Sequence, residues 1–294
     1  MDEINQLTNQ LTKSQTPSSL FYPISQLLLS KVSLVVNSIR FRLIEIEFYL
    51  YNNKHTDIFA HKFNCQKMNL HWYFHRSSEK EHSYKGGTFK GLDLTCGSDD
   101  SYGGILIRSI MDLSNNKIIE GPCKIVEKIL EITKCISIKD LVLNKMNNDI
   151  SVHHPLLCLK DDQHSLQDIF RSPRIGLTLK KSDNIELRRH YICQPYRFLI
   201  FPSSIKKGKK MILYIAINEK STHIINQYFN YNQQQIDSIN KIIDCLRNTT
   251  LDQSKFTDLT DDQRLQIFFN QSHSQFAGIK KIKIQLKKTN LNQK

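Results

Sequence analysis

Apolar and polar residues alternate strictly along "IEIEFYL", residues 44–50. This period of two predicts a strand over 42–50 with one apolar face. The opposite face carries two carboxylates and a phenol, from Glu45, Glu47 and Tyr49. An acidic residue on a strand is usually solvated or salt-bridged. The pattern alone therefore leaves two interpretations open, a surface glutamate and a buried general base.

The other patterns before residue 205 predict helices and strands in irregular order. Residues 1–19 are polar, and we expect them to form a flexible lead. Residues 20–36 predict a short helix that runs into a strand, and 51–85 is rich in loops and aromatic residues. Residues 120–133 predict a helix with Pro122 in its first turn, where proline is favourable. Further strands are expected at 103–110, 174–180 and 194–201.

A basic run at 203–210 separates this part from the rest of the chain. The apolar residues 211–217 are a strand candidate, and 233–248 predicts an amphipathic helix. A second helix is expected over 260–271, with Thr260 and Asp261 as N-cap candidates. Lysine alternates with isoleucine and leucine over 279–288, which is typical of an edge strand or a basic tail.

Strands interspersed with helices, without regular βαβ alternation, predict an α+β fold. We expect a single compact domain over residues 20–205, with a curved mixed or antiparallel sheet and a few helices. A basic C-terminal extension of helices and a strand is expected over 206–294.

The chain has 41 lysines and arginines against 28 aspartates and glutamates, a formal net charge of +13. This charge favours nucleic acid or an anionic membrane surface as partner, with a lysine-rich composition as the alternative explanation. Seven scattered cysteines without a CxxC favour a reducing compartment over a disulfide framework. Because no signal peptide or apolar run long enough for a membrane span is present, we expect a soluble intracellular protein without a membrane partner.

Several short motifs have simple interpretations. "GGTFKG" (86–91) lacks the spacing of a phosphate-binding loop and predicts a glycine-containing turn between strands. "HWYFH" (71–75) lacks the glutamate and third ligand of a zinc site, so we expect loop or groove histidines and no metal. Arg108 lies in an apolar strand and therefore needs a partner. The run Lys206–Lys210 predicts a solvated loop or phosphate contacts.

Six segments, taken in order, resemble the alkyladenine (3-methyladenine) DNA glycosylases over about residues 20–201. They resemble the family's helix with its Glu-x-Glu-x-Tyr-Leu strand, its acidic-Ala-His segment and its aliphatic strand ending in arginine. They also resemble its Gly-Pro-x-Lys helix start, its Arg-Ile/Val-Gly strand and its Lys-Pro-x-Arg-Phe strand. In this chain they read "LLLSKVSLVV…IRFRLIEIEFYL", "DIFAH", "GGILIRSI", "EGPCKIV", "RIGLTLK" and "QPYRFLI".

The resemblance implies a monofunctional DNA glycosylase that flips a damaged purine out of duplex DNA and hydrolyses its N-glycosidic bond in base excision repair. It implies that Glu47 is the general base for water and that Tyr49 stacks on the flipped base. It further implies that His61 closes the pocket and that Arg108 contacts the flipped nucleotide. No cofactor is implied, and we expect a monomer in the nucleus or, alternatively, the cytoplasm.

The chain departs from that family at the turn whose tyrosine wedges into the duplex. "GGTFKGLDLTCGS" replaces it, with Phe89 or Lys90 as candidate wedge, and the pocket asparagine is missing, with Thr95 nearest. Backbone phosphates would be bound by Lys206, Lys207, Lys209 and Lys210. Two alternatives remain: a nucleic-acid-binding module on the same fold with altered catalysis, and a structural subunit that binds partners through residues 211–294.

Overall fold

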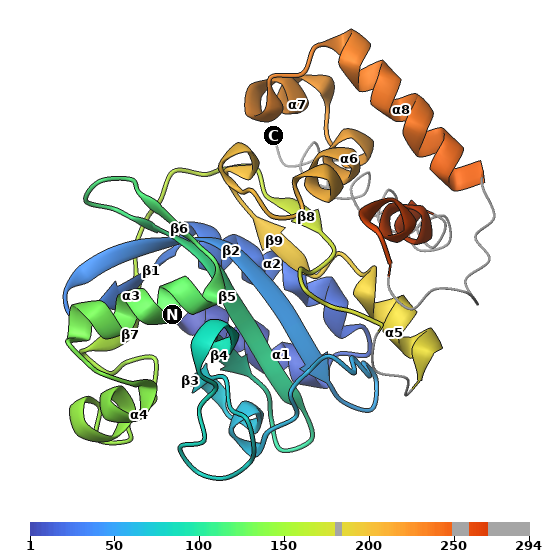
Figure 1. The fold of residues 1–294 in the computed structure, drawn as a ribbon. Helices are drawn as coiled ribbons and strands as arrows, with labels where there is room; N and C mark the ends of the chain where they lie inside the picture. The colour runs from blue at the N-terminus through green and yellow to red at the C-terminus, as the bar shows by residue number, and fades with distance from the viewer. Residues whose placement is uncertain (180–183, 249–258, 270–294) are drawn as a thin grey trace, which may run out of the picture. The chain divides into compact units, whose positions relative to one another are not determined.

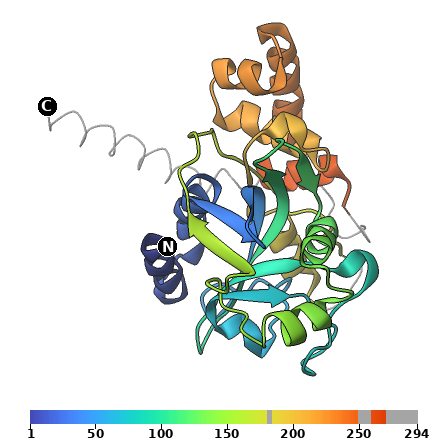
Figure 2. The ribbon, with the colours of Figure 1, turned by 90° about the vertical axis from the view of Figure 1, so that its left-hand side faces the viewer.

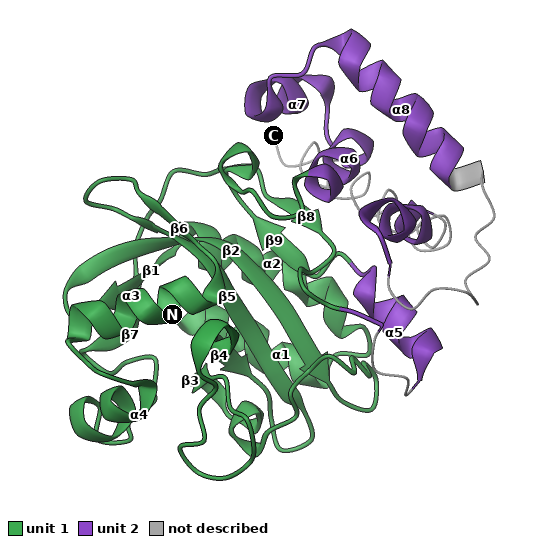
Figure 3. Cartoon of the chain, viewed as in Figure 1, with its two compact units in different colours: residues 1–177, 195–209 green, residues 178–194, 210–294 purple. Residues whose placement is uncertain are grey.

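The computed structural model describes residues 1–179, 184–248 and 259–269, which divide into two compact units (Figure 3). Unit 1 comprises residues 1–177 and 195–209, and unit 2 comprises the described residues of 178–194 and 210–294. The division at residue 209 lies close to the expected boundary after 205. Residues 178–194, however, group with the C-terminal part rather than with the predicted domain.

Unit 1 combines helices with one antiparallel sheet (Figure 1). Its helices are α1 (Asp2–Lys13), α2 (Phe21–Ser30), α3 (Pro122–Thr133) and the single turn α4 (Ile138–Asp140). Further helical turns lie at Pro17–Leu20, Asn64–Lys67, Gly87–Phe89, Leu141–Lys145 and Pro202–Ser204. Its strands are β1 (Val32–Val36), β2 (Ile39–Tyr51), β3 (Asn69–Phe74), β4 (Leu92–Cys96), β5 (Tyr102–Asp112), β6 (Ile118–Glu120), β7 (Leu157–Asp161), β8 (Phe170–Ser172) and β9 (Arg197–Leu199).

The long strand β2 organises the sheet. The main path runs β3-β4-β5-β2-β1-β7, and every pairing among the described strands is antiparallel. One edge of β2 pairs with β5, while its other edge pairs first with β1 and then, at Glu45–Glu47, with β9. Helices α1 and α2 lie on one side of the sheet and α3 on the other (Figures 1 and 2). This is the α+β fold with a curved sheet that the sequence predicts.

The alternation along β2 is reproduced in the structure. Phe48 stacks on Phe21 of α2 at a ring-centroid distance of 4.3 Å, so α2 covers the apolar face. Side chains of Glu45 and Glu47 lie on the opposite face, where they are nonetheless fully buried. Register shifts on both sides of Glu45 mark an irregularity of the β2–β5 ladder, the kind of feature that re-aims side chains.

The N-terminal lead is a correction, because residues 2–13 form α1 instead of a flexible segment. Ile4 and Leu11 of α1 are buried, three to four residues apart from the buried Thr8. This spacing places all three on one helix face, so α1 packs in unit 1 and contacts α2 and β3.

The two strands expected late in unit 1 are shorter or absent. Residues 174–179 form no strand, because Pro173 lacks an amide hydrogen and Gly176 has a positive φ of 82°. Phe170–Ser172 pairs with β9 instead. Of the strand expected at 194–201, only Arg197–Leu199 is paired as β9.

Unit 2 is helical in its described part. Its helices are α5 (Ile185–Ile192), α6 (Lys209–Glu219, which begins at the unit boundary), α7 (Thr222–Phe229), α8 (Gln233–Asn248) and residues 261–269. The helix expected at 233–248 is confirmed, and the helix expected at 260–271 is present over 261–269. The strand expected at 211–217 is wrong: these residues lie in α6, since a short apolar run buried all round does not reveal its period. Residues 279–288 lie outside the described residues.

Candidate functional site

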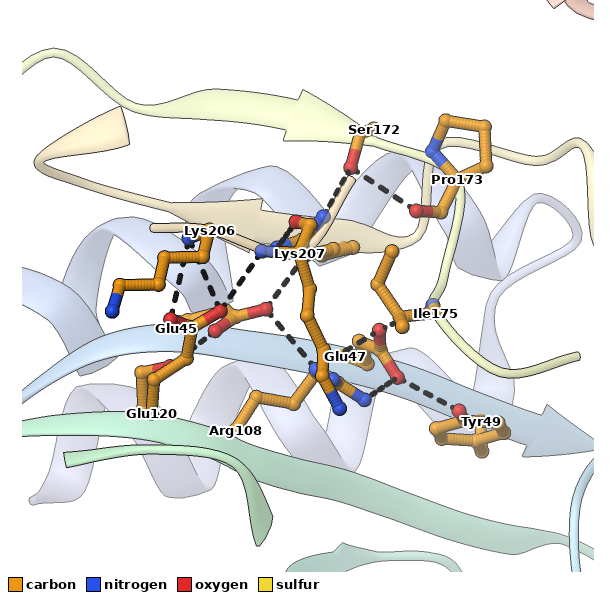
Figure 4. A network of polar contacts seen from close by, with 12 residues as sticks. Glu45, Glu47, Tyr49, Arg108, Glu120, Ser172, Pro173, Ile175, Lys206 and Lys207 are labelled. Carbon is orange, nitrogen blue, oxygen red and sulfur yellow. Dashed lines mark hydrogen bonds and ion pairs between the residues drawn. The ribbon is translucent and has the colours of Figure 1, made fainter. Parts of the chain in front are cut away.

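A buried network of acidic and basic side chains occupies the polar face of β2 (Figure 4). Arg108 Nε of β5 and Arg197 Nε of β9 donate to Glu45 Oε1 at 3.0 and 2.7 Å, and the Ser109 hydroxyl donates to Glu45 Oε2. Burial alone would raise the pKa of Glu45, but the two guanidinium groups and the Ser109 hydrogen bond lower it below its usual value. Glu45 is therefore an ionised anchor between two arginines.

Glu47, the predicted general base, is held from three directions. The Tyr49 hydroxyl donates to Glu47 Oε2 at 2.8 Å, and the Ile175 amide donates to Oε1 at 2.8 Å. Arg108 Nε lies 3.4 Å from Oε1, so the sheet brings together two residues to which the resemblance gives separate roles (Figure 4). The Glu47 side chain is 0% exposed, which fixes its orientation inside unit 1.

Tyr49 lies between this network and a second buried ion pair. Arg174 forms a fork with Asp57, at 2.5 and 3.1 Å, and donates to the Phe48 carbonyl at 2.9 Å. The guanidinium carbon lies 4.4 Å from the centroid of the Tyr49 ring. One face of the ring that the resemblance assigns to base stacking is therefore covered by Arg174. Burial and the Glu47 carboxylate raise the pKa of Tyr49 well above its usual value.

The strand register extends this polar face across three further strands. Glu47 pairs with Leu106 of β5, Leu106 with Asp93 of β4, and Asp93 with Tyr73 of β3. Residues directly opposite in an antiparallel ladder point to the same face. With strands about 5 Å apart, the backbones of Glu47 and Asp93 are separated by about 10 Å. Asp93 and Tyr73 therefore belong to the same face as the predicted base.

The far end of this row belongs to a histidine cluster, which Tyr73 and Asp93 form together with His61, His75 and Lys85. His61 Nδ1 lies 3.0 Å from the Tyr73 hydroxyl, and Lys85 Nζ donates to His61 Nε2 at 3.2 Å. His75 Nε2 lies 2.8 Å from Asp93 Oδ1, and the two imidazole rings are 4.6 Å apart. Burial, with the neighbouring His75 and Lys85, lowers the pKa of His61 to about 4. His61 is consequently neutral at neutral pH.

The two candidate wedge residues differ in their surroundings. Phe89 is 74% exposed at the end of the turn Gly87–Phe89. Lys90 Nζ instead donates to Glu127 of α3 at 3.0 Å. An exposed phenyl ring is free to meet a partner, whereas the Lys90 ammonium already has one.

The four lysines predicted to bind phosphates lie at the unit boundary. In unit 1, the backbone amides of Lys206 and Lys207 donate to the Glu120 carboxylate at 3.0–3.2 Å (Figure 4), and the side chains of Lys206, Lys207 and Lys209 are exposed. In unit 2, Lys210 Nζ pairs with Asp262 at 2.5 Å. All four lysines are thus exposed, and Lys210 is in addition held by an ion pair with Asp262.

Some residues to which the sequence analysis gave no role complete the carboxylate–arginine network and the histidine cluster. Arg174 and Arg197 lie in segments that carry the resemblance, but only their buried ion pairs with Asp57 and Glu45 identify their positions. His75 lies in "HWYFH", where spacing suggested only a metal site to be excluded. Thr95, the residue nearest to the missing asparagine, is buried and accepts from the His71 amide.

Within the described residues, no group of three or more His, Cys, Asp or Glu side chains is arranged to hold a metal ion. In the same part of the chain, no helix combines the length and apolar character that crossing a membrane requires. The seven cysteines, all in the described ranges, are free thiols.

These features define an α+β protein with a buried carboxylate–arginine network on the polar face of its sheet. No model of a known protein family matches the chain. "Uncharacterized protein L759" of Acanthamoeba polyphaga mimivirus is 37% identical to it over 207 residues, which cover 64% of this chain and 89% of that protein. The chain belongs to the same family as this mimivirus protein.

Proposed function

We propose that the protein is a DNA glycosylase that hydrolyses the N-glycosidic bond of alkylated or deaminated purines. The observation that carries this proposal is the meeting of Glu47, Tyr49 and Arg108 on one sheet face, at 2.8 Å between Tyr49 and Glu47 and 3.4 Å between Arg108 and Glu47. These are three of the residues to which the family resemblance assigns the water-activating base, the stacking ring and the nucleotide contact.

The chemistry requires a carboxylate at this position. Breaking a purine N-glycosidic bond develops positive charge on the sugar, which an ionised Glu47 would stabilise while it takes a proton from the attacking water. The three donors around Glu47 fix its oxygens before substrate arrives, so little reorganisation is needed. Tyr49 and His61 are only partly buried and supply aromatic surface for a flipped base.

Features outside the site fit a nucleic-acid substrate. The exposed Phe89 is suited to fill the space that a flipped base leaves in the duplex. Lys206, Lys207 and Lys209 are suited to contact backbone phosphates, in agreement with the net charge of +13.

A second candidate is a DNA-binding module on the same fold without catalysis. It is favoured by the complete burial of Glu47 and by Arg174, which covers one face of the Tyr49 ring. In this alternative, the network orients the sheet and the basic surface alone binds DNA.

Cleavage of duplex oligonucleotides containing hypoxanthine or ethenoadenine distinguishes the two candidates, with hot alkali revealing abasic sites. Wild type, Glu47→Gln and the control Glu131→Gln, an exposed carboxylate on α3, are compared. We expect wild type and Glu131→Gln to cut and Glu47→Gln to bind without cutting. If all three bind and none cuts, the binding module is the better account. If none binds, both candidates are wrong.

A further inference from the structure

A cavity of about 80 Å³ lies in unit 1 between α2, the start of β2 and residues 165–169. We call it the Arg42 cavity, and its walls include Arg42, Tyr22, Leu29, Leu166, Ile169 and Ile200. We propose that the Arg42 cavity binds a small organic monocarboxylate, a ligand that joins one carboxylate to a short apolar part.

The Arg42 cavity is separate from the carboxylate–arginine network. Arg42 Nε donates to the Leu29 carbonyl of α2 at 3.2 Å, so the Arg42 side chain lies on the sheet face that α2 covers. Glu47 lies on the opposite face of β2. The proposed binding site is therefore distinct from the proposed glycosylase site and does not depend on that function.

Arg42 is a buried cation to which the described residues supply no anionic partner. Its side chain is 4% exposed, and no carboxylate in the described part of the chain forms an ion pair with it. Carboxylates raise the pKa of the buried Arg108 and Arg174, whereas burial lowers the pKa of Arg42. Because an isolated charge is costly to remove from water, an anion bound beside Arg42 would be stabilised.

The Arg42 guanidinium also has donors to spare. A guanidinium carries five N–H bonds. Nε donates to Leu29, while Nη1 and Nη2 donate to the Ser165 hydroxyl and carbonyl at 3.4 and 2.8 Å. Within the described residues, one N–H bond on each Nη thus remains without an acceptor. Two donors match the two oxygens of a carboxylate, whereas a phosphate would keep further oxygens unsatisfied.

The walls of the cavity favour a ligand with a single charge and an apolar part. Asp168 also lines the cavity, and its carboxylate would repel a doubly charged anion more strongly than a singly charged one. Leu29, Ile169 and Ile200 are buried apolar wall residues, which suit a short alkyl chain. Both features favour a monocarboxylate over a phosphate or a dicarboxylate.

The size and opening of the cavity suit a small ligand. One water needs about 10–15 Å³ of such space, so about 80 Å³ admits a ligand of a few non-hydrogen atoms. Two of the wall residues are well exposed, Leu166 at 84% and Tyr22 at 45%. The cavity is therefore open to solvent at these side chains, and a ligand can enter there.

Butyrate is a suitable probe, because it joins one carboxylate to a three-carbon chain. We expect it to bind the full-length protein with a Kd on the order of 1 mM, measured by the NMR relaxation of its methyl protons. Butyramide has the same shape without the charge, and inorganic phosphate has the charge without the alkyl chain. In competition with butyrate, both should bind at least about tenfold more weakly, because each lacks one of the two interactions.

Variants locate the site. Arg42→Gln should weaken butyrate binding at least about tenfold, since it removes the charged hydrogen bonds. Arg40→Gln removes the same charge from a partly exposed position on the same strand and should leave the affinity unchanged. Leu166→Glu does not alter the buried arginine, but it places a negative charge at the opening and should weaken binding several-fold, whereas Leu166→Gln should not. Trp72 fluorescence establishes that each variant is folded.

Equal affinities for butyrate and butyramide, or tighter binding of phosphate, would overturn the assignment of a monocarboxylate. Equal losses in Arg42→Gln and Arg40→Gln would mean that net charge attracts the anion, and the Arg42 site would then be wrong. If wild type binds no butyrate, the proposed site is also wrong. None of these results bears on the glycosylase proposal, which oligonucleotide cleavage tests separately.

Discussion

Acidification should destabilise unit 1 through His61, and this effect can be isolated from the other histidines. The pKa of His61 is lowered from 6.5 to about 4 in the folded protein, chiefly by burial. Between these two values the unfolded chain binds a proton at His61 that the folded chain does not. Stability is therefore greatest above about pH 6.5 and is lost as the pH falls toward 4.

The magnitude follows from the two pKa values. At pH 5 the unfolded histidine is almost fully protonated, while the folded one is mostly neutral. Linkage then gives a loss of about 2 kcal/mol between pH 7.5 and pH 5, since one pKa unit corresponds to about 1.4 kcal/mol. At pH 7.5 the stability is less than about 0.1 kcal/mol below its value at still higher pH, so pH 7.5 serves as the reference.

The assay is urea unfolding followed by the fluorescence of Trp72, the only tryptophan of the chain, which is 1% exposed on β3 and therefore reports on unit 1. The loss on acidification should be about 2 kcal/mol smaller in His61→Gln than in wild type. His153→Gln, an exposed histidine of unit 1, should behave as wild type. If His61→Gln loses as much stability as wild type between the two pH values, His61 is not held neutral and the hydrogen-bond assignment of the cluster is wrong.

Three further predictions concern other parts of unit 1. Arg174→Ala leaves Asp57 as an unpaired buried charge and should cost about 3–5 kcal/mol in urea unfolding, whereas Arg40→Ala, in a partly exposed pair, should cost less than about 1 kcal/mol. Phe89→Ala should change the free energy of unfolding by less than about 0.5 kcal/mol, because the ring is exposed, yet weaken binding to damaged duplex in a fluorescence anisotropy titration. Log affinity for duplex DNA should fall less steeply with log salt concentration when Lys206, Lys207 and Lys209 are all replaced by glutamine. The magnitude of the slope should decrease by about 2.7, whereas Lys210→Gln should leave it unchanged.

Local patterns were sufficient to predict the central strands. The alternation in 44–50 gave both the strand β2 and the correct face for Glu45, Glu47 and Tyr49, because the period of a strand is fixed by backbone geometry. The helices α3 and α8 were predicted for the same reason, from apolar stripes with helical spacing. Where the period disappears, as in the uniformly apolar 211–217, the prediction was wrong.

The partners of the buried charges could not be predicted from local patterns. Arg197 and Glu45 are 152 positions apart, and Arg174 and Asp57 are 117 apart. The proximity of Arg197 to Glu45 depends on β9 pairing with β2 at Glu45–Glu47, which no period within either segment specifies. The His75–Asp93 pair likewise depends on the register of β3 and β4. Sequence patterns predict which face a residue occupies, whereas the register between distant strands decides what it meets there.

The buried charges of unit 1 contribute more to the orientation of the Glu47 side chain than to the stability of the fold. Removing ions from water is costly, and apolar replacements of buried pairs are often equally stable. The apolar face of the same sheet already supplies a core, in which Phe48 packs on Phe21. What the charges add is a chain of contacts in which Arg197 holds Glu45, Glu45 holds Arg108, and Arg108 meets Glu47. Three strands thereby fix one carboxylate in a single orientation, which is the property that a general base requires.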